Sequence, residues 1–114
     1  QPDCVVSIHQ NSYHEEYVTG AQVFYYGTSQ EGQRLAETLQ KKLVAYVDPE
    51  NHRQAKANES YYLLKKTEVP IVIVECGFLS NWEEAKKLQE DNYQNQIAWA
   101  VSMGILSYLE EGEE

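Results

Sequence analysis

Two polar residues stand at the ends of apolar runs, where strands of a sheet would bring them to one edge. His9 follows the run at residues 4–8, and Glu75 follows the run at residues 71–74. A carboxylate beside such a run is costly unless it has a partner or a chemical task. Together an imidazole and a carboxylate fit a metal ligand and a general base. The structural alternatives are a hydrogen-bonded core histidine and a rim glutamate bonded to loop amides.

Other side chains with chemical potential have weaker patterns. Cys76 beside Glu75 suggests a thiol nucleophile working with His9, but alternation along a strand points neighbouring side chains to opposite faces. Residues 14–16 read His-Glu-Glu and could hold a metal, yet their spacing from His9 is not that of a helical HExxH motif. Cys4 and Cys76 have no C-x-x-C spacing, so we expect buried free thiols, with a disulfide as the open alternative.

Three runs rich in β-branched and aromatic residues predict the strands that position these groups. They cover residues 4–9, 20–26 and 71–75, and a shorter strand is expected at 61–64. Residues 71–74 are apolar on both faces, which is typical of a central strand in a parallel sheet. If the first and last of these strands are parallel neighbours, His9 and Glu75 enter one crevice at their carboxyl ends.

Amphipathic segments predict helices at residues 28–47, 80–89 and 92–109. Thr28 and Glu31 have capping-box spacing at the start of the first helix, and Pro49 ends it. Loops are expected at 13–19 and 49–60, and the second is long enough to suggest a function. Strands alternating with helices predict an α/β fold with a largely parallel sheet flanked by helices.

Size and charge limit the classes of function. The 114 residues fit a single domain covering 1–114, and the net charge of −9 argues against a nucleic-acid partner, which needs clustered Lys and Arg. The longest mostly apolar run, at residues 97–109, is shorter than the roughly 20 residues of a membrane helix. We therefore expect no nucleic-acid partner and no membrane-spanning segment in this chain.

Four segments, in this order and spacing, resemble the type-3 zinc-dependent N-acetylmuramoyl-L-alanine amidases, which include sporulation-associated members. The segments are SIHQN at 7–11, GAQVFYY at 20–26, RQAK at 53–56 and VPIVIVECGFLSN at 69–81. The resemblance extends over nearly the whole chain. The pairing of SIHxN with VExGFLSN is far more specific than either short motif alone.

The resemblance implies hydrolysis of the amide between N-acetylmuramic acid and L-alanine in peptidoglycan, in the extracellular wall or envelope of a bacterium. In that family two His and one Glu hold Zn2+, with a water in the open position. His9 matches the second His ligand, Glu75 the catalytic glutamate, and Asn11 an asparagine that orients the cleft or the substrate. Arg53 is a candidate for binding a stem-peptide carboxylate, with a solvated Arg as the alternative. The need for an activator protein stays open.

The chain departs from the family pattern at its beginning. The family's first His follows a GHG-type turn and its ligand Glu comes later, whereas this sequence begins at the strand that ends in His9. We therefore expect a fold incomplete at the N-terminus and a chain that is inactive alone. We also expect no tightly held zinc, or a zinc site completed by a neighbouring molecule. One alternative is a non-catalytic wall-binding or partner-binding module that keeps the amidase fold. Another is a related zinc carboxypeptidase or other peptide-cleaving metallohydrolase.

Overall fold

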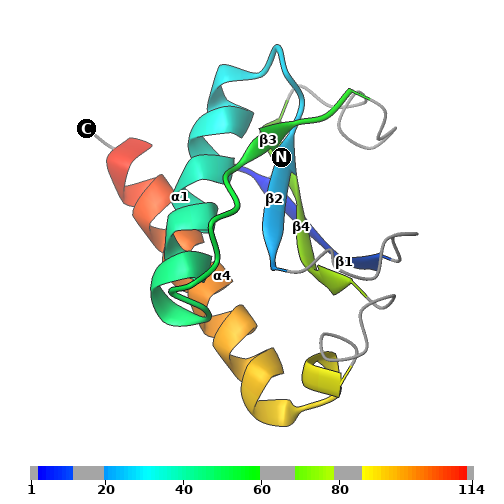
Figure 1. Ribbon diagram of the computed structural model, residues 1–114. Helices are drawn as coiled ribbons and strands as arrows, with labels where there is room; N and C mark the ends of the chain where they lie inside the picture. The colour runs from blue at the N-terminus through cyan, green and yellow to red at the C-terminus, as the bar shows by residue number, and fades with distance from the viewer. Residues whose placement is uncertain (1–2, 12–19, 60–68, 79–85, 113–114) are drawn as a thin grey trace.

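The computed structural model describes residues 3–11, 20–59, 69–78 and 86–112, and the statements below concern these residues. Their helices and strands follow the order β1 (Val5–Asn11), β2 (Gln22–Tyr25), α1 (Gln30–Tyr46), β3 (Lys56–Ala57), β4 (Ile71–Phe78) and α4 (Asp91–Gly112). Figure 1 shows α1 and α4 together on one side of the sheet. The expected loop at 13–19, the strand at 61–64 and the start of the helix at 80–89 lie outside the described residues.

The strands form one mixed sheet in the order β1-β4-β2-β3. β1 is parallel to β4 and β2 is parallel to β3, whereas β2 is antiparallel to β4. The expected α/β class and the position of β4 inside the sheet are therefore confirmed. The reversed strand, β2, follows β1 after fewer residues than the dozen or more that a parallel crossover needs.

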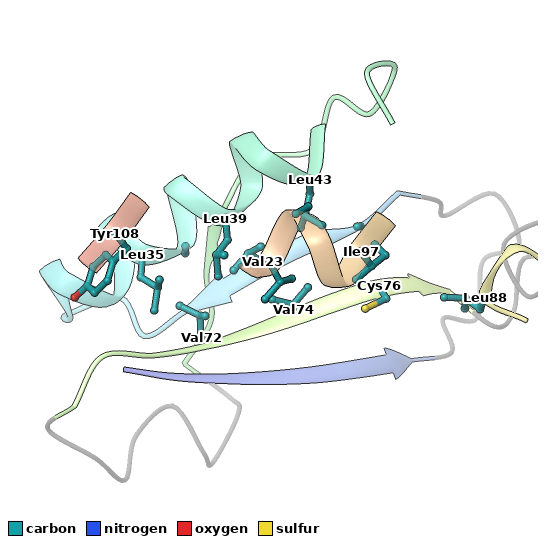
Figure 2. Close-up of a cluster of buried hydrophobic side chains, with 14 residues drawn as sticks. Val23, Leu35, Leu39, Leu43, Val72, Val74, Cys76, Leu88, Ile97 and Tyr108 are labelled. Atoms are coloured by element: carbon teal, nitrogen blue, oxygen red, sulfur yellow. The ribbon is translucent and has the colours of Figure 1, made fainter. Parts of the chain in front are cut away.

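One face of the sheet packs on the helices and forms the main core. Figure 2 shows Val23, Val72, Val74 and Cys76 of the sheet lying against Leu35, Leu39 and Leu43 of α1 and Ile97 and Tyr108 of α4. The predicted stripe of leucines on α1 is confirmed, because all three are at most 1% exposed. The burial of these side chains is the largest favourable contribution to folding in this part of the chain.

The opposite face of the sheet carries a second, smaller apolar cluster. Ile71 and Ile73 of β4 pack there with Val5, Phe24 and Tyr26. Since side chains alternate along a strand, Glu75 continues this face and Cys76 belongs to the helical face. The apolar cluster therefore leads directly to the candidate glutamate.

The start of α1 differs from the prediction. Ser29, not Thr28, is the N-cap residue, with extended dihedrals and a hydroxyl oxygen that accepts a hydrogen bond from Gly32 N at 2.9 Å. Glu31 does not close a capping box, because its carboxylate bonds Arg34 and Tyr108 instead. The capping-box prediction was wrong because, with Ser29 as the N-cap, the third helical position is Gly32, which has no side chain to bond back to the cap.

Other elements differ from the prediction as well. β1 and β4 continue beyond the predicted 4–9 and 71–75, to Asn11 and Phe78. The expected loop at 49–60 contains the short strand β3, which extends the sheet beside β2. The last helix, α4, reaches beyond both ends of the predicted 92–109 segment. Among the described helices, α4 included, none has the length and apolar character to cross a membrane.

Candidate functional site

His9 and Glu75 occupy matching positions on neighbouring strands. β1 and β4 run parallel, and His9 is the register partner of Glu75 near the carboxyl ends of both strands. Register partners in a pleated sheet project from the same face, so the imidazole and the carboxylate leave the sheet side by side. The expectation that these two strands are parallel neighbours is confirmed.

A third polar residue continues this line across the sheet. Gln22 of β2 is the register partner of Glu75 on the strand's other side. We call His9, Glu75 and Gln22 the polar row. Glu75 is 1% exposed and Gln22 is 8% exposed, so the two residues from β4 and β2 lie inside the protein. A carboxylate held there between an imidazole and an amide is suited to moving a proton in a site that excludes bulk water.

The imidazole of His9 is oriented from its own strand. His9 Nε2 shares a hydrogen bond with Ser7 Oγ at 2.8 Å, and the two residues face the same way because they are two positions apart. The ring nitrogen that carries the proton depends on the tautomer. An imidazole held through one ring nitrogen can present the other to a metal ion, and imidazole is a common zinc ligand.

Asn11 follows His9 across an irregularity in the pairing. The register passes from His9 opposite Glu75 to Asn11 opposite Phe78, so β4 has an extra residue between the two pairs. Such a bulge changes the direction in which the following side chains point. The side chain of Asn11 itself lies outside the described residues.

Arg53 is tied to the polar row through Gln22. Arg53 Nη1 donates to Gln22 Oε1 at 3.3 Å, while Gln22 Nε2 donates to the carbonyl oxygen of Gln54 at 2.9 Å. The predicted loop therefore brings its arginine to the strand next to Glu75. This link joins residues 31 positions apart in sequence.

Asn51 attaches the same segment to the start of β2. Its Nδ2 donates to the carbonyl oxygen of Ala21 at 2.9 Å, and its Oδ1 accepts from Arg53 N at 2.9 Å. Gly20 makes this approach possible: its φ is +92°, and an added Cβ would lie 2.9 Å from Asn51 Oδ1. Only glycine adopts such a backbone readily, and it also leaves room for the asparagine.

A pocket of about 550 Å³ opens beside this end of β2. Its lining includes Gln22, Asn51 and Arg53, so it adjoins the polar row. A larger pocket, of about 710 Å³, lies between α1 and residues 51–55 and includes neither Gln22 nor Glu75 in its lining. The smaller pocket is the better candidate for substrate because it reaches the residue paired with Glu75.

Cys76 lies on the far face from the polar row. It is buried in the helical core, and burial, with a smaller effect from the charge of Glu75, raises the pKa of its thiol to about 12. A thiol that stays protonated at neutral pH is a poor nucleophile. Cys4 and Cys76 are both free thiols, as expected, but only Cys76 is buried and Cys4 is partly exposed.

The residues present fit part of a zinc site. His9 supplies an imidazole and Glu75 a carboxylate, whereas a catalytic zinc has three protein ligands. No group of three or more His, Cys, Asp or Glu side chains able to hold a metal occurs in the part of the chain that the structure describes. Residues 14–16, the other metal-binding candidates, lie outside that part.

Sequence reasoning missed Gln22 and Asn51. Gln22 interrupts an apolar, aromatic strand, which is the signal that also drew attention to Glu75. The partner that makes it informative, Arg53, lies in a loop, and no periodicity connects the two. Asn51 had only the composition of that loop as a signal.

Comparisons with known proteins agree on one family. A model of the family described as N-acetylmuramoyl-L-alanine amidase matches residues 1–107. The germination-specific N-acetylmuramoyl-L-alanine amidase of Bacillus subtilis is 34% identical over 111 residues, which cover 97% of this chain and 46% of that protein.

Solved structures give the same result. The CwlD amidase of Clostridioides difficile, in complex with the GerS lipoprotein, matches with a TM-score of 0.91 at 42% identity, covering 95% of this chain and 55% of that one. AmiC2 of Nostoc punctiforme, an N-acetylmuramoyl-L-alanine amidase, matches with a TM-score of 0.84 at 33% identity, covering 95% and 58%. The chain spans about half the length of the proteins that it matches.

Proposed function

The chain belongs to the N-acetylmuramoyl-L-alanine amidase family, and from this premise we propose that it forms part of an enzyme that hydrolyses the amide between N-acetylmuramic acid and L-alanine in peptidoglycan. The supporting observation is the register of His9 and Glu75 at the carboxyl ends of two parallel strands. Open α/β sheets bind ligands at that edge. An imidazole and a buried carboxylate placed together there suit metal-assisted hydrolysis of an amide.

Each residue of the proposed site has a distinct task. His9 is the proposed zinc ligand, and zinc, when bound, lowers the pKa of a water and polarises the substrate carbonyl. Glu75 accepts a proton from the attacking water and returns it to the leaving amine of L-alanine. Asn11 and Arg53 are the proposed substrate-binding residues, the first following His9 on β1 and the second beside Gln22.

The proposal extends to the organisation of the catalytic domain. Residues 1–114 form one portion of a single amidase domain, and further zinc ligands are needed to complete the site. Because His9 matches only one of the three zinc ligands of the family pattern, we expect the isolated chain to hold no tight zinc and to hydrolyse nothing.

The setting of the reaction follows from the substrate. Peptidoglycan lies outside the cytoplasmic membrane, so we propose that the protein acts in the wall or envelope of a bacterium. The germination-specific relative favours a role in sporulation or germination. The CwlD amidase was solved with the GerS lipoprotein, which supports a search for an activator protein here as well.

Two variants of the complete protein, with its remaining ligands present, test the division of labour. Glu75→Ala is expected to lower release of stem peptide by about 10²- to 10⁴-fold while zinc content stays unchanged, because it removes proton transfer and not the metal. His9→Ala is expected to lose both zinc and activity. The measurements are zinc per protein and muropeptide release, with the exposed Glu37→Ala as control.

Contrary results separate the alternatives. Near-normal activity in Glu75→Ala would mean that this carboxylate is a structural rim residue. A wild-type protein that is loaded with zinc, binds peptidoglycan and releases no stem peptide would instead be a non-catalytic wall-binding module.

A further inference from the structure

The amide of Gln22 connects the proposed catalytic carboxylate to a loop arginine. Gln22 is the register partner of Glu75, and its side chain is hydrogen-bonded at both ends. It is 8% exposed in a strand whose other residues are apolar. Burying a primary amide costs free energy unless it is hydrogen-bonded, and Gln22 finds its partners in Arg53 and Gln54 of the loop.

The orientation of this amide follows from its partners. Gln22 Nε2 donates to the carbonyl oxygen of Gln54, a group that can only accept. Oε1 therefore faces the other way and accepts from Arg53 Nη1. Arg53 is therefore held at its backbone by Asn51 and at its guanidinium by Gln22, which lowers the entropy that the residue loses when it binds a ligand.

Several titratable side chains line the pocket beside β2, and they differ in how far they are buried. Arg53 is half-buried, whereas Glu50 and His52 are exposed and lie at the solvent side. Asp48 uses Oδ1 to accept a hydrogen bond from Glu50 N, which engages it in the local turn. Among the residues that line this pocket, Arg53 is the charged residue that hydrogen-bonds Gln22 of the polar row.

We propose that Arg53 recognises a free carboxylate of the stem peptide and that Gln22 is the positioning residue that holds its guanidinium on the Glu75 side of the pocket. This rests on the proposed function. A guanidinium carries five N–H donors in a planar fork, so it can contact Gln22 and a carboxylate together. The enzyme then discriminates between stem peptides that carry a carboxylate and those that carry a carboxamide at the same position.

The test compares matched muropeptides with the complete, zinc-loaded protein. One has all carboxylates free, one is amidated at the second stem residue, and one is amidated at the peptide's C-terminus, which separates the two sources of carboxylate. Amidation at the recognised position is expected to raise KM by about 10- to 100-fold with little change in kcat, since a charge-assisted hydrogen bond is lost. Calorimetric titration of the stem peptide alone is expected to show the same ratio in Kd.

Variants then show which residues produce the preference for a free carboxylate. Arg53→Ala is expected to abolish the preference, and Gln22→Met, which keeps the volume but removes both hydrogen bonds, to reduce it by about 10-fold or more. In the double variant the preference should equal that of Arg53→Ala, because Gln22 acts through Arg53. Gln33→Met, at an exposed glutamine of α1, is the matched control and should change nothing.

Two outcomes overturn the inference while leaving the proposed function in place. One is equal KM and Kd for free and amidated peptides in the wild type. The other is a Gln22→Met variant that loses activity equally on all three substrates, which would indicate a structural role. Failure of the wild type to cleave any of them contradicts the proposed function, and the inference falls with it.

Discussion

A second glutamine, Gln40, holds β2 from the helical side. Its Oε1 accepts from Val23 N at 2.8 Å and its Nε2 donates to the carbonyl oxygen of Ala21 at 3.1 Å. Gln40 is 4% exposed, so α1 presents a polar group within its apolar face. At the scale of single residues, β2 is positioned by one buried glutamine on each face, and one of them, Gln22, is the neighbour of Glu75.

Gln40→Leu tests the structural half of this arrangement. The substitution leaves a buried backbone N–H and a buried carbonyl without that partner, so we expect the free energy of unfolding to fall by about 1–3 kcal/mol. Denaturant unfolding of the wild type and the variant measures the change. Gln33→Leu, an exposed change on the same helix, should stay within about 0.5 kcal/mol. Equal stability in the two variants would show that the amide of Gln40 is dispensable.

At the scale of elements, the close contact between α1 and α4 depends on Gly104. A Cβ built at this position would lie 3.3 Å from the Cα of Leu39 and would also meet the Leu39 side chain. Leu39 is fully buried and packs between the sheet and α4. The absence of a side chain at Gly104 allows the two helix backbones to approach, which lets both cover the same face of the sheet (Figure 1).

Gly104→Ala should therefore destabilise the protein although alanine is the better helix former. Overpacking costs about 1–3 kcal/mol, against a gain in helix propensity of about 1 kcal/mol, so the expected net loss is about 1–2 kcal/mol. Ser102→Ala, at an exposed position of α4, is the control and should be neutral or slightly stabilising. Thermal unfolding measures both. A higher Tm for Gly104→Ala would mean that the helices move apart without cost.

At the scale of the whole molecule, a charged cluster joins the start of α1 to the end of α4. The guanidinium of Arg34 lies 4.1 Å from the ring centre of Tyr108 and forms ion pairs with Glu31 and Glu111 at 2.9 Å and 3.2 Å. Tyr108 OH donates to Glu31 Oε2 at 2.8 Å. The hydroxyl bond from Tyr108, followed by the bond from Arg34, lowers the pKa of Glu31, while burial is the main cause that raises the pKa of Tyr108 to about 12.

This cluster makes stability depend on pH in the acid range. The pKa of Glu31 is lower in the folded protein than its ordinary value of 4.5, so its contribution is present above pH 4.5 and is lost as pH falls through the folded value. Glu31→Gln should lower Tm near pH 7, and the difference from wild type should shrink at acid pH. The exposed Glu37→Gln is the control. A difference in Tm that does not change with pH would contradict this linkage.

Local patterns in the sequence were sufficient for most of the described elements, although not for β3, and for the placement of His9 and Glu75 on their strands. Alternation along a strand depends only on neighbouring residues, so it predicted β4, a strand with His9 near its carboxyl end, and the opposite directions of Glu75 and Cys76. The 3.6-residue period of a helix predicted the buried face of α1 in the same way. The roles of His9, Glu75, Asn11 and Arg53 in binding and catalysis remain predictions.

Tertiary structure alone decided which segments meet. The strand order β1-β4-β2-β3 and the reversed β2 depend on contacts between segments far apart in the chain. The link from Gln22 to Arg53 is of the same kind. A periodic pattern records which face of a segment is apolar, but many partners can cover an apolar face. The partner is selected by the packing of the whole core and by the hydrogen bonds that each buried polar group must find.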